Sequence, residues 1–110
     1  MSQYQHIVLL RFPPRTTHET IAEIFEAIDE MRDRIPGIVD IDAGEYESPE
    51  GLNQGFTHGF VVTFADMASR DAYLEHPDHE PVKQLILDAL EGNLEDVLAF
   101  DFKVDVRFRY

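Results

Sequence analysis

The clearest strand in the sequence is Phe56-Thr57-His58-Gly59-Phe60-Val61-Val62-Thr63-Phe64. Successive side chains of a β-strand point to opposite faces, so its even-numbered residues share one face. That face carries three phenylalanines, a valine and a histidine, whereas the other carries two threonines, a glycine and a valine. We therefore expect a strand with one strongly apolar face, and the segments on either side of it indicate how that face is covered.

A strand and an amphipathic helix are predicted before this stretch. Residues 6–12 are rich in branched and aromatic side chains on both faces, which predicts a strand buried on both sides. Thr16 and Glu19 have the spacing of a capping box, in which both side chains satisfy free amides at the start of a helix. Apolar residues then recur at helical spacing up to Ile35, where Pro36-Gly37 predicts the end of the helix.

A second strand precedes the central stretch and a broken helical region follows it. Residues 38–46 predict a strand with one face formed by Val39, Ile41 and Ala43, and the loop 48–55 is rich in Gly, Pro, Ser and Asn.

After the central stretch, Asp66 is suited to cap a short helix that ends at residue 73 or 74. A turn at Pro77 follows, and Pro81 suits the first turn of the next helix. Residues 97–108 predict a last strand.

The predicted order is β-α-β-β-α-β with a broken second helix, in one domain of residues 1–110. This is the split order of a ferredoxin-like α+β fold, an antiparallel sheet with its helices on one face. The other face then carries large apolar side chains, which mark an interface rather than a surface left in water. We therefore expect a homodimer in which a second copy packs sheet to sheet and closes a dimeric α/β barrel around an interior.

The composition excludes several classes of function. Nine basic residues against 22 acidic ones give a net charge of −13, which repels phosphate backbones, so we expect no nucleic-acid partner. The acidic surface favours solubility, and salt in a saline host would screen its self-repulsion. The absence of cysteine excludes disulfides and thiol nucleophiles. No apolar run has the length of a membrane span and the N-terminus lacks a signal-peptide pattern, so we expect a cytoplasmic protein without a membrane partner.

The segment Tyr73-Leu-Glu-His-Pro-Asp-His-Glu-Pro81 places a phenol, two imidazoles and three carboxylates close together. Histidine changes charge near physiological pH, so His79 can act as a base while Tyr73 donates to a developing oxyanion or orients His79. His76 is a further candidate for ligand binding. The alternative is structural, with His79 capping the following helix and Tyr73 packing against the sheet.

Two more histidines are candidates for the same pocket. His58 lies on the apolar face of its strand, and His6 opens the first strand, a neighbour in the predicted sheet. They form the polar part of a mostly apolar pocket, or each is a core histidine with its own hydrogen-bond partner.

We expect no transition-metal site and no organic cofactor. His76 and His79 lie in a proline-rich turn that does not hold both rings on one helical face, as shared coordination requires. The side chains do not indicate whether backbone carbonyls near residues 35–37 bind a hard cation, so this question is left open.

Five segments together resemble the stress-responsive α/β-barrel domain (Dabb) family: residues 6–12, 35–38, 48–58, 73–81 and 95–102. The resemblance spans residue 6 to about residue 104. It implies a ferredoxin-like fold and a homodimer. A plant polyketide cyclase of this family closes its substrate by an intramolecular aldol reaction, with a Tyr and His pair that falls on Tyr73 and His79 and pocket histidines that fall on His6 and His58. The resemblance thus implies a small organic ligand and cyclase-like acid–base chemistry, and the alternative is a non-catalytic, stress-associated structural dimer.

Overall fold

The structure of this chain is a computed structural model that describes residues 2–104. Its elements follow the order β1 (Tyr4–Leu10), α1 (His18–Arg34), β2 (Ile38–Glu45), β3 (His58–Phe64), α2 (Met67–Glu75), α3 (Glu80–Ala89), the 3-10 turn η1 (Leu94–Asp96) and β4 (Val97–Lys103). The predicted β-α-β-β-α-β order and the break in the second helix are confirmed. No helix among residues 2–104 is long and apolar enough to cross a membrane.

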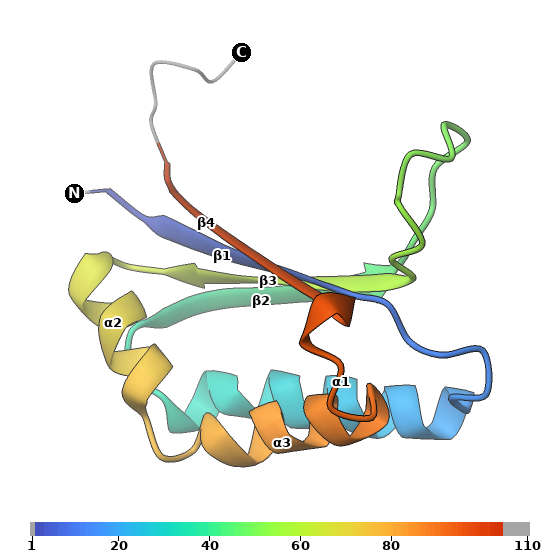
Figure 1. Ribbon diagram of the computed structural model, residues 1–110. Coiled ribbons are helices and arrows are strands. Elements are labelled where there is room, and N and C mark those ends of the chain that lie inside the picture. Colours follow the sequence, from blue (N-terminus) through green and yellow to red (C-terminus); the bar gives the residue numbers. More distant parts are fainter. Residues whose placement is uncertain (1, 105–110) are drawn as a thin grey trace.

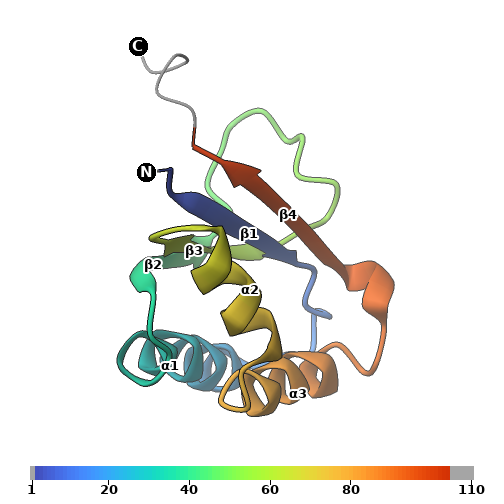
Figure 2. The same cartoon turned by 90° about the vertical axis from the view of Figure 1, so that its left-hand side faces the viewer.

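The four strands form one antiparallel sheet in the order β2-β3-β1-β4, and the helices lie on one face of it (Figure 1). The view turned by 90° shows α2 close beneath the sheet, with α1 and α3 in a lower row (Figure 2). This is the predicted ferredoxin-like α+β arrangement.

The core lies between the sheet and the helices α1, α2 and α3. The even-numbered residues of β1 and β3 point toward the helices, and Leu10, Val62 and Phe64 are fully buried there. They meet the stripe of α1 that includes Ile24 and Ile28. Complete burial of each such side chain contributes roughly 1.5–3 kcal/mol, so the apolar periodicity of the strand and of the helix holds the layers together.

The first strand and the first helix begin at other residues than predicted. β1 runs from Tyr4 to Leu10 rather than over residues 6–12, and in the single chain only its helix-facing side chains are buried. Thr17, not Thr16, caps α1 by accepting a hydrogen bond from the Thr20 amide at 3.1 Å. The Thr16 amide instead donates to the Pro13 carbonyl at 3.0 Å, which keeps that residue in the preceding turn.

The side chains that β2 buries are not all the predicted ones. The register shifts between Ile38 and Asp40, so Ile38 packs against the core while Val39 is 49% exposed. A β-bulge inserts one extra residue into the strand, so the side chains before the bulge point to the opposite face of the sheet from the one predicted. Ile41 keeps its predicted inward position.

β3 begins at His58, two residues later than predicted. The ring of Phe56 lies instead under the guanidinium of Arg11, 4.5 Å from the ring centroid.

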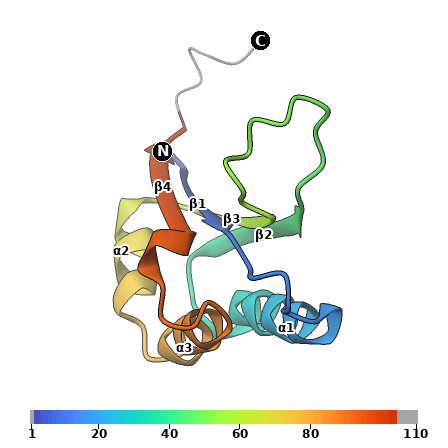
Figure 3. The ribbon, with the colours of Figure 1, turned by 45° about the vertical axis from the view of Figure 1, so that its right-hand side comes forward.

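Among residues 2–104, no helix lies over the other face of the sheet in the single chain, and only the loop between β2 and β3 rises on that side (Figure 3). Ladder partners share a face, so Ile7, Val61 and Phe100 form one row across it. Leu98, Phe100 and Phe102 are 41%, 59% and 40% exposed. The sequence predicted a last strand that extends to residue 108. Its residues Val106 and Phe108 lie outside the described residues.

Gly37 allows β2 to start close to α2. Its φ is +93°, and a Cβ at this position would lie 2.4 Å from Ser69 Oγ. Only glycine combines that conformation with so close an approach. The contact fixes the start of α2, the helix that carries Tyr73.

Candidate active site

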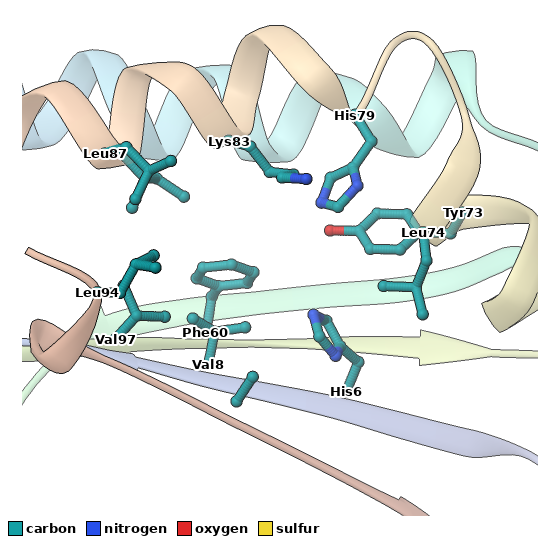
Figure 4. Close-up of a pocket in the computed structure, with 12 residues that line it drawn as sticks. His6, Val8, Phe60, Tyr73, Leu74, His79, Lys83, Leu87, Leu94 and Val97 are labelled. Carbon is teal, nitrogen blue, oxygen red and sulfur yellow. The ribbon is translucent and has the colours of Figure 1, made fainter. Parts of the chain in front are cut away.

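A pocket of about 420 Å³ lies between the sheet and the helices α2 and α3 (Figure 4). Its polar lining residues are His6, Tyr73, His79 and Lys83. Its apolar walls include Val8, Phe60, Ile86, Leu87, Leu94 and Val97. The pocket is therefore mostly apolar with a few polar groups, as small-molecule sites generally are.

The secondary structure determines which side chains reach the pocket. His6 and Val8 alternate along β1 and so share its helix-facing side. On the opposite wall, His79, Lys83 and Leu87 follow one another at intervals of four residues along one face of α3. Tyr73 enters from the last turns of α2.

The pocket has two chemically different ends. Figure 4 shows His6, Tyr73 and His79 together at one end, and Leu87 with Leu94 at the other. A ligand that fills it is therefore expected to be polar at one end and apolar at the other.

The pocket lies on the helix side of a single chain. We expected a pocket in an enclosed interior between two sheets, whereas His6, Tyr73 and His79 line a pocket on the helix-facing side of the sheet, opposite to Phe100. Packing of helices against β1 and β4 forms the pocket without a second copy.

Tyr73 and His79 meet by ring stacking. Their ring centroids are 4.2 Å apart at an interplanar angle of 34°. No hydrogen bond joins the two side chains among the described residues, and the Tyr73 hydroxyl points into the pocket (Figure 4). His79 occupies the N-cap position of α3 but forms no side-chain capping bond, so the alternative capping role is not seen.

The surroundings of this pair favour the neutral form of both side chains. Burial lowers the pKa of His79 and a hydrogen bond to the Leu74 backbone opposes this, while the charges of Lys83 and His6 lower the pKa further. Burial raises the pKa of the Tyr73 phenol, and the Asp101 charge raises it further. Within the described residues, His79 Nδ1 is buried and has no hydrogen-bond partner. A neutral imidazole can accept a proton and a neutral phenol can donate a hydrogen bond, so the pair is suited to acid–base chemistry.

The carboxylate of Asp101, which was not predicted from the sequence, binds the imidazole of His6. Its Nδ1 lies 2.6 Å from Asp101 Oδ1, and Arg70 donates to Asp101 Oδ2 at 2.8 Å. Burial alone would raise the pKa of Asp101, but the hydrogen bonds from His6 and Arg70 lower it. An ionised carboxylate only accepts, so the Nδ1 of His6 carries a proton and its Nε2 is the ring nitrogen left for a ligand.

His58 does not join this pocket. It is paired with Leu10 across the sheet, whereas His6 is paired with Val62. Four residues of strand separate the two positions, which corresponds to roughly 13 Å. The His58 ring instead packs edge-on against Phe12 and Phe25 at centroid distances of 5.3 and 5.7 Å. It fits the alternative of a core histidine, and burial lowers its pKa.

His76 also lies outside the pocket lining. Its Nδ1 accepts a hydrogen bond from the Asp78 amide at 3.1 Å, within the turn between α2 and α3. Among residues 2–104, no group of three or more His, Asp or Glu side chains is arranged to hold a metal ion.

Three residues of the site were missed from the sequence. Lys83 was detectable, because it lies four residues after His79 in a predicted helix. Asp101 could be found only from the register that places it opposite His6, and Arg70 only from the docking of α2.

Comparisons with known proteins agree with this architecture. The profile of the Stress responsive A/B Barrel Domain family matches residues 4–104. The stress-response A/B barrel domain-containing protein HS1 of Arabidopsis thaliana is 29% identical over 99 residues, which cover 90% of this chain and 87% of that protein. Olivetolic acid cyclase of Cannabis sativa is 26% identical over 98 residues, covering 89% of this chain and 93% of that protein.

One solved structure among the similar ones is a dimeric ferredoxin-like protein of unknown function from Jannaschia. It superposes with a TM-score of 0.83 at 24% identity, over 93% of this chain and 99% of that one. At this identity the likeness confirms the fold.

Proposed function

This chain belongs to the stress-responsive A/B barrel domain family, and from that membership we propose that it binds a small organic molecule in the helix–sheet pocket and catalyses a proton transfer on it. The observation that carries the proposal is the imidazole of His79 stacked on the phenol of Tyr73 at the polar end of an apolar pocket, where burial lowers the pKa of the first and raises the pKa of the second.

The proposed step has two partners. His79 removes a proton from a carbon next to a carbonyl group, and Tyr73 donates a hydrogen bond to the oxygen on which negative charge develops. His6, oriented by Asp101, offers Nε2 as a second polar contact for the same ligand. The cyclase among the relatives, whose name assigns it a ring-forming reaction on a small molecule, supports this class of chemistry.

The proposal includes a homodimer built on the uncovered sheet face. Phe100 and its apolar neighbours on β1 and β4 are partly exposed in the single chain, and exposed apolar patches of this kind mark interfaces. A two-fold dimer would bury them against the same patch of a second copy. The similar structure from Jannaschia, described as dimeric, supports a dimer.

The test uses a substrate that reports any well-placed base. In 5-nitrobenzisoxazole a base removes the ring C–H proton, the N–O bond breaks, and a coloured nitrile-bearing phenolate is released. We expect turnover by the protein, a loss of about a hundredfold or more in kcat/KM for His79→Ala, and a smaller loss for Tyr73→Phe.

His18→Ala is the matched control, because His18 is exposed at the start of α1, outside the pocket. This variant is expected to keep the full rate. Equal rates in the wild type, His79→Ala and buffer containing free imidazole would favour the non-catalytic structural dimer.

A further inference from the structure

We propose that the natural ligand of this pocket carries a carboxylate, that Lys83 recognises it, and that the rest of the ligand is an apolar tail. The inference rests on the proposed function of the same pocket and adds the chemical class of its ligand. It is carried by the composition of the lining and by the position of Lys83 along α3.

The lining has the opposite charge balance to the chain. The protein has 22 acidic residues and only two lysines, Lys83 and Lys103. None of the 12 lining residues is Asp or Glu, whereas one of the two lysines and two of the five histidines are among them. Because a net charge of −13 repels anions, an anionic ligand requires such a local cation.

Lys83 lies one helical turn beyond His79. Its backbone amide donates to the His79 carbonyl at 3.1 Å, so the two side chains emerge on the same face of α3. Figure 4 shows its ammonium group directed toward the end of the pocket that holds Tyr73 and His79. A carboxylate bound to Lys83 therefore lies beside the proposed base.

Lys83 is available for such a ligand. Its ion pair with Glu80 spans 3.5 Å, and the Glu80 side chain is 72% exposed. The Lys83 side chain is itself 48% exposed, and an exposed ion pair of this length contributes little free energy, so a ligand carboxylate in the pocket can replace Glu80 as the partner of the ammonium group.

The remainder of the pocket fits an apolar tail. Beyond Lys83 the same face of α3 continues with Ile86 and Leu87, and Leu94 and Val97 line the wall across from them. These side chains offer burial but no hydrogen bonds, so they select alkyl or aryl groups. The ligand class is thus an amphipathic organic acid, with its head at Lys83 and its tail along α3.

The test compares two probes of nearly equal shape, 4-butylbenzoate and 4-butylbenzamide, which differ in charge. Isothermal titration calorimetry of the full chain is expected to show the carboxylate binding about fivefold to tenfold more tightly than the amide. Lys83→Gln is expected to remove this preference while it leaves the affinity for the amide unchanged. Lys83→Arg is expected to retain the preference.

Lys103→Gln is the matched control, since it removes the other lysine, which does not line the pocket. It is expected to keep the wild-type preference. Equal affinity of the two probes for the wild type, or an undiminished preference in Lys83→Gln, overturns the inference and leaves the proposed pocket intact. Failure of both probes to bind overturns the pocket itself and the inference with it.

Discussion

Asp101 lies directly opposite His6 in the β1–β4 ladder, and its carboxylate binds the Nδ1 of that imidazole at 2.6 Å. The pair links an edge strand of the sheet to the polar end of the pocket. Since the carboxylate sets which nitrogen of His6 carries the proton, the contact determines what His6 can offer to a ligand.

In Asp101→Asn the side chain is expected no longer to fix which nitrogen of His6 carries the proton, because an amide can donate as well as accept a hydrogen bond. Nitrogen chemical shifts of the His6 ring are expected to change from one tautomer to a mixture. Loss of the charged hydrogen bonds is expected to cost about 2 kcal/mol of unfolding free energy near pH 7.

The same substitution has a defined pH dependence. The folded-state pKa of Asp101 is lowered, so its stabilisation is present above its ordinary pKa of 3.8 and is lost as the pH falls through the folded value. Urea titrations are therefore expected to show wild type and Asp101→Asn converging in strongly acidic buffer. A difference in unfolding free energy between the wild type and Asp101→Asn that stays constant with pH would contradict this prediction.

The activity of the wild type is expected to persist at lower pH than a free imidazole would allow. His79 must be neutral to act as a base, and burial lowers its pKa below the ordinary 6.5. The charges of Lys83 and His6 act in the same direction, whereas a hydrogen bond to the Leu74 backbone and the charge of Glu80 oppose it. The acid limb of kcat/KM for 5-nitrobenzisoxazole is therefore expected to have its midpoint below 6.5. In Lys83→Gln the midpoint is expected to rise, and a midpoint at or above 6.5 in the wild type would refute the assignment.

Phe100→Asp is expected to convert the proposed dimer to a monomer, because it places a charge in the centre of the exposed apolar row. Size-exclusion chromatography with light scattering is expected to read twice 12.7 kDa for the wild type and a single chain for the variant. Leu85→Asp, at a partly exposed position on α3, serves as the control and is expected to remain dimeric. If the wild type is itself a monomer, the proposed dimer interface is wrong.

Gly37→Ala is expected to destabilise the fold by about 2–4 kcal/mol through a strained φ and a clash with Ser69. Gly51→Ala separates the two causes, since Gly51 has a φ of +68° but no atoms within 4 Å of an added Cβ. That control is expected to lose only about 1 kcal/mol in thermal or urea unfolding. Equal losses in both variants would show that the contact with Ser69 has no effect.

Local patterns in the sequence predicted the order of the elements. The alternation of β3 and the helical stripe ending at Ile35 depend on neighbours a few residues away, so they can be read directly. The register shift at Val39 could not, because it depends on the pairing with β3, and the cap at Thr17 could not, because the Thr16 amide is held in the preceding turn.

The site could be predicted only in part, because strand register joins residues distant in sequence. Tyr73 and His79 were identified together because one short segment carries both. His58 was grouped with His6 on the correct pair of neighbouring strands, but the register holds them four residues apart. The same register brings Asp101 to His6, across 95 positions of the chain.

β4 presents Phe100 and Phe102 on one side and Asp101 on the other. A shift of this strand that improves packing on the outer side therefore displaces the carboxylate on the inner side. The helix α3 takes no part in this ladder, so its pocket-facing side chains can be exchanged without moving either Phe100 or Asp101. Redesign of the ligand preference is therefore expected to succeed at α3 before it succeeds at β4.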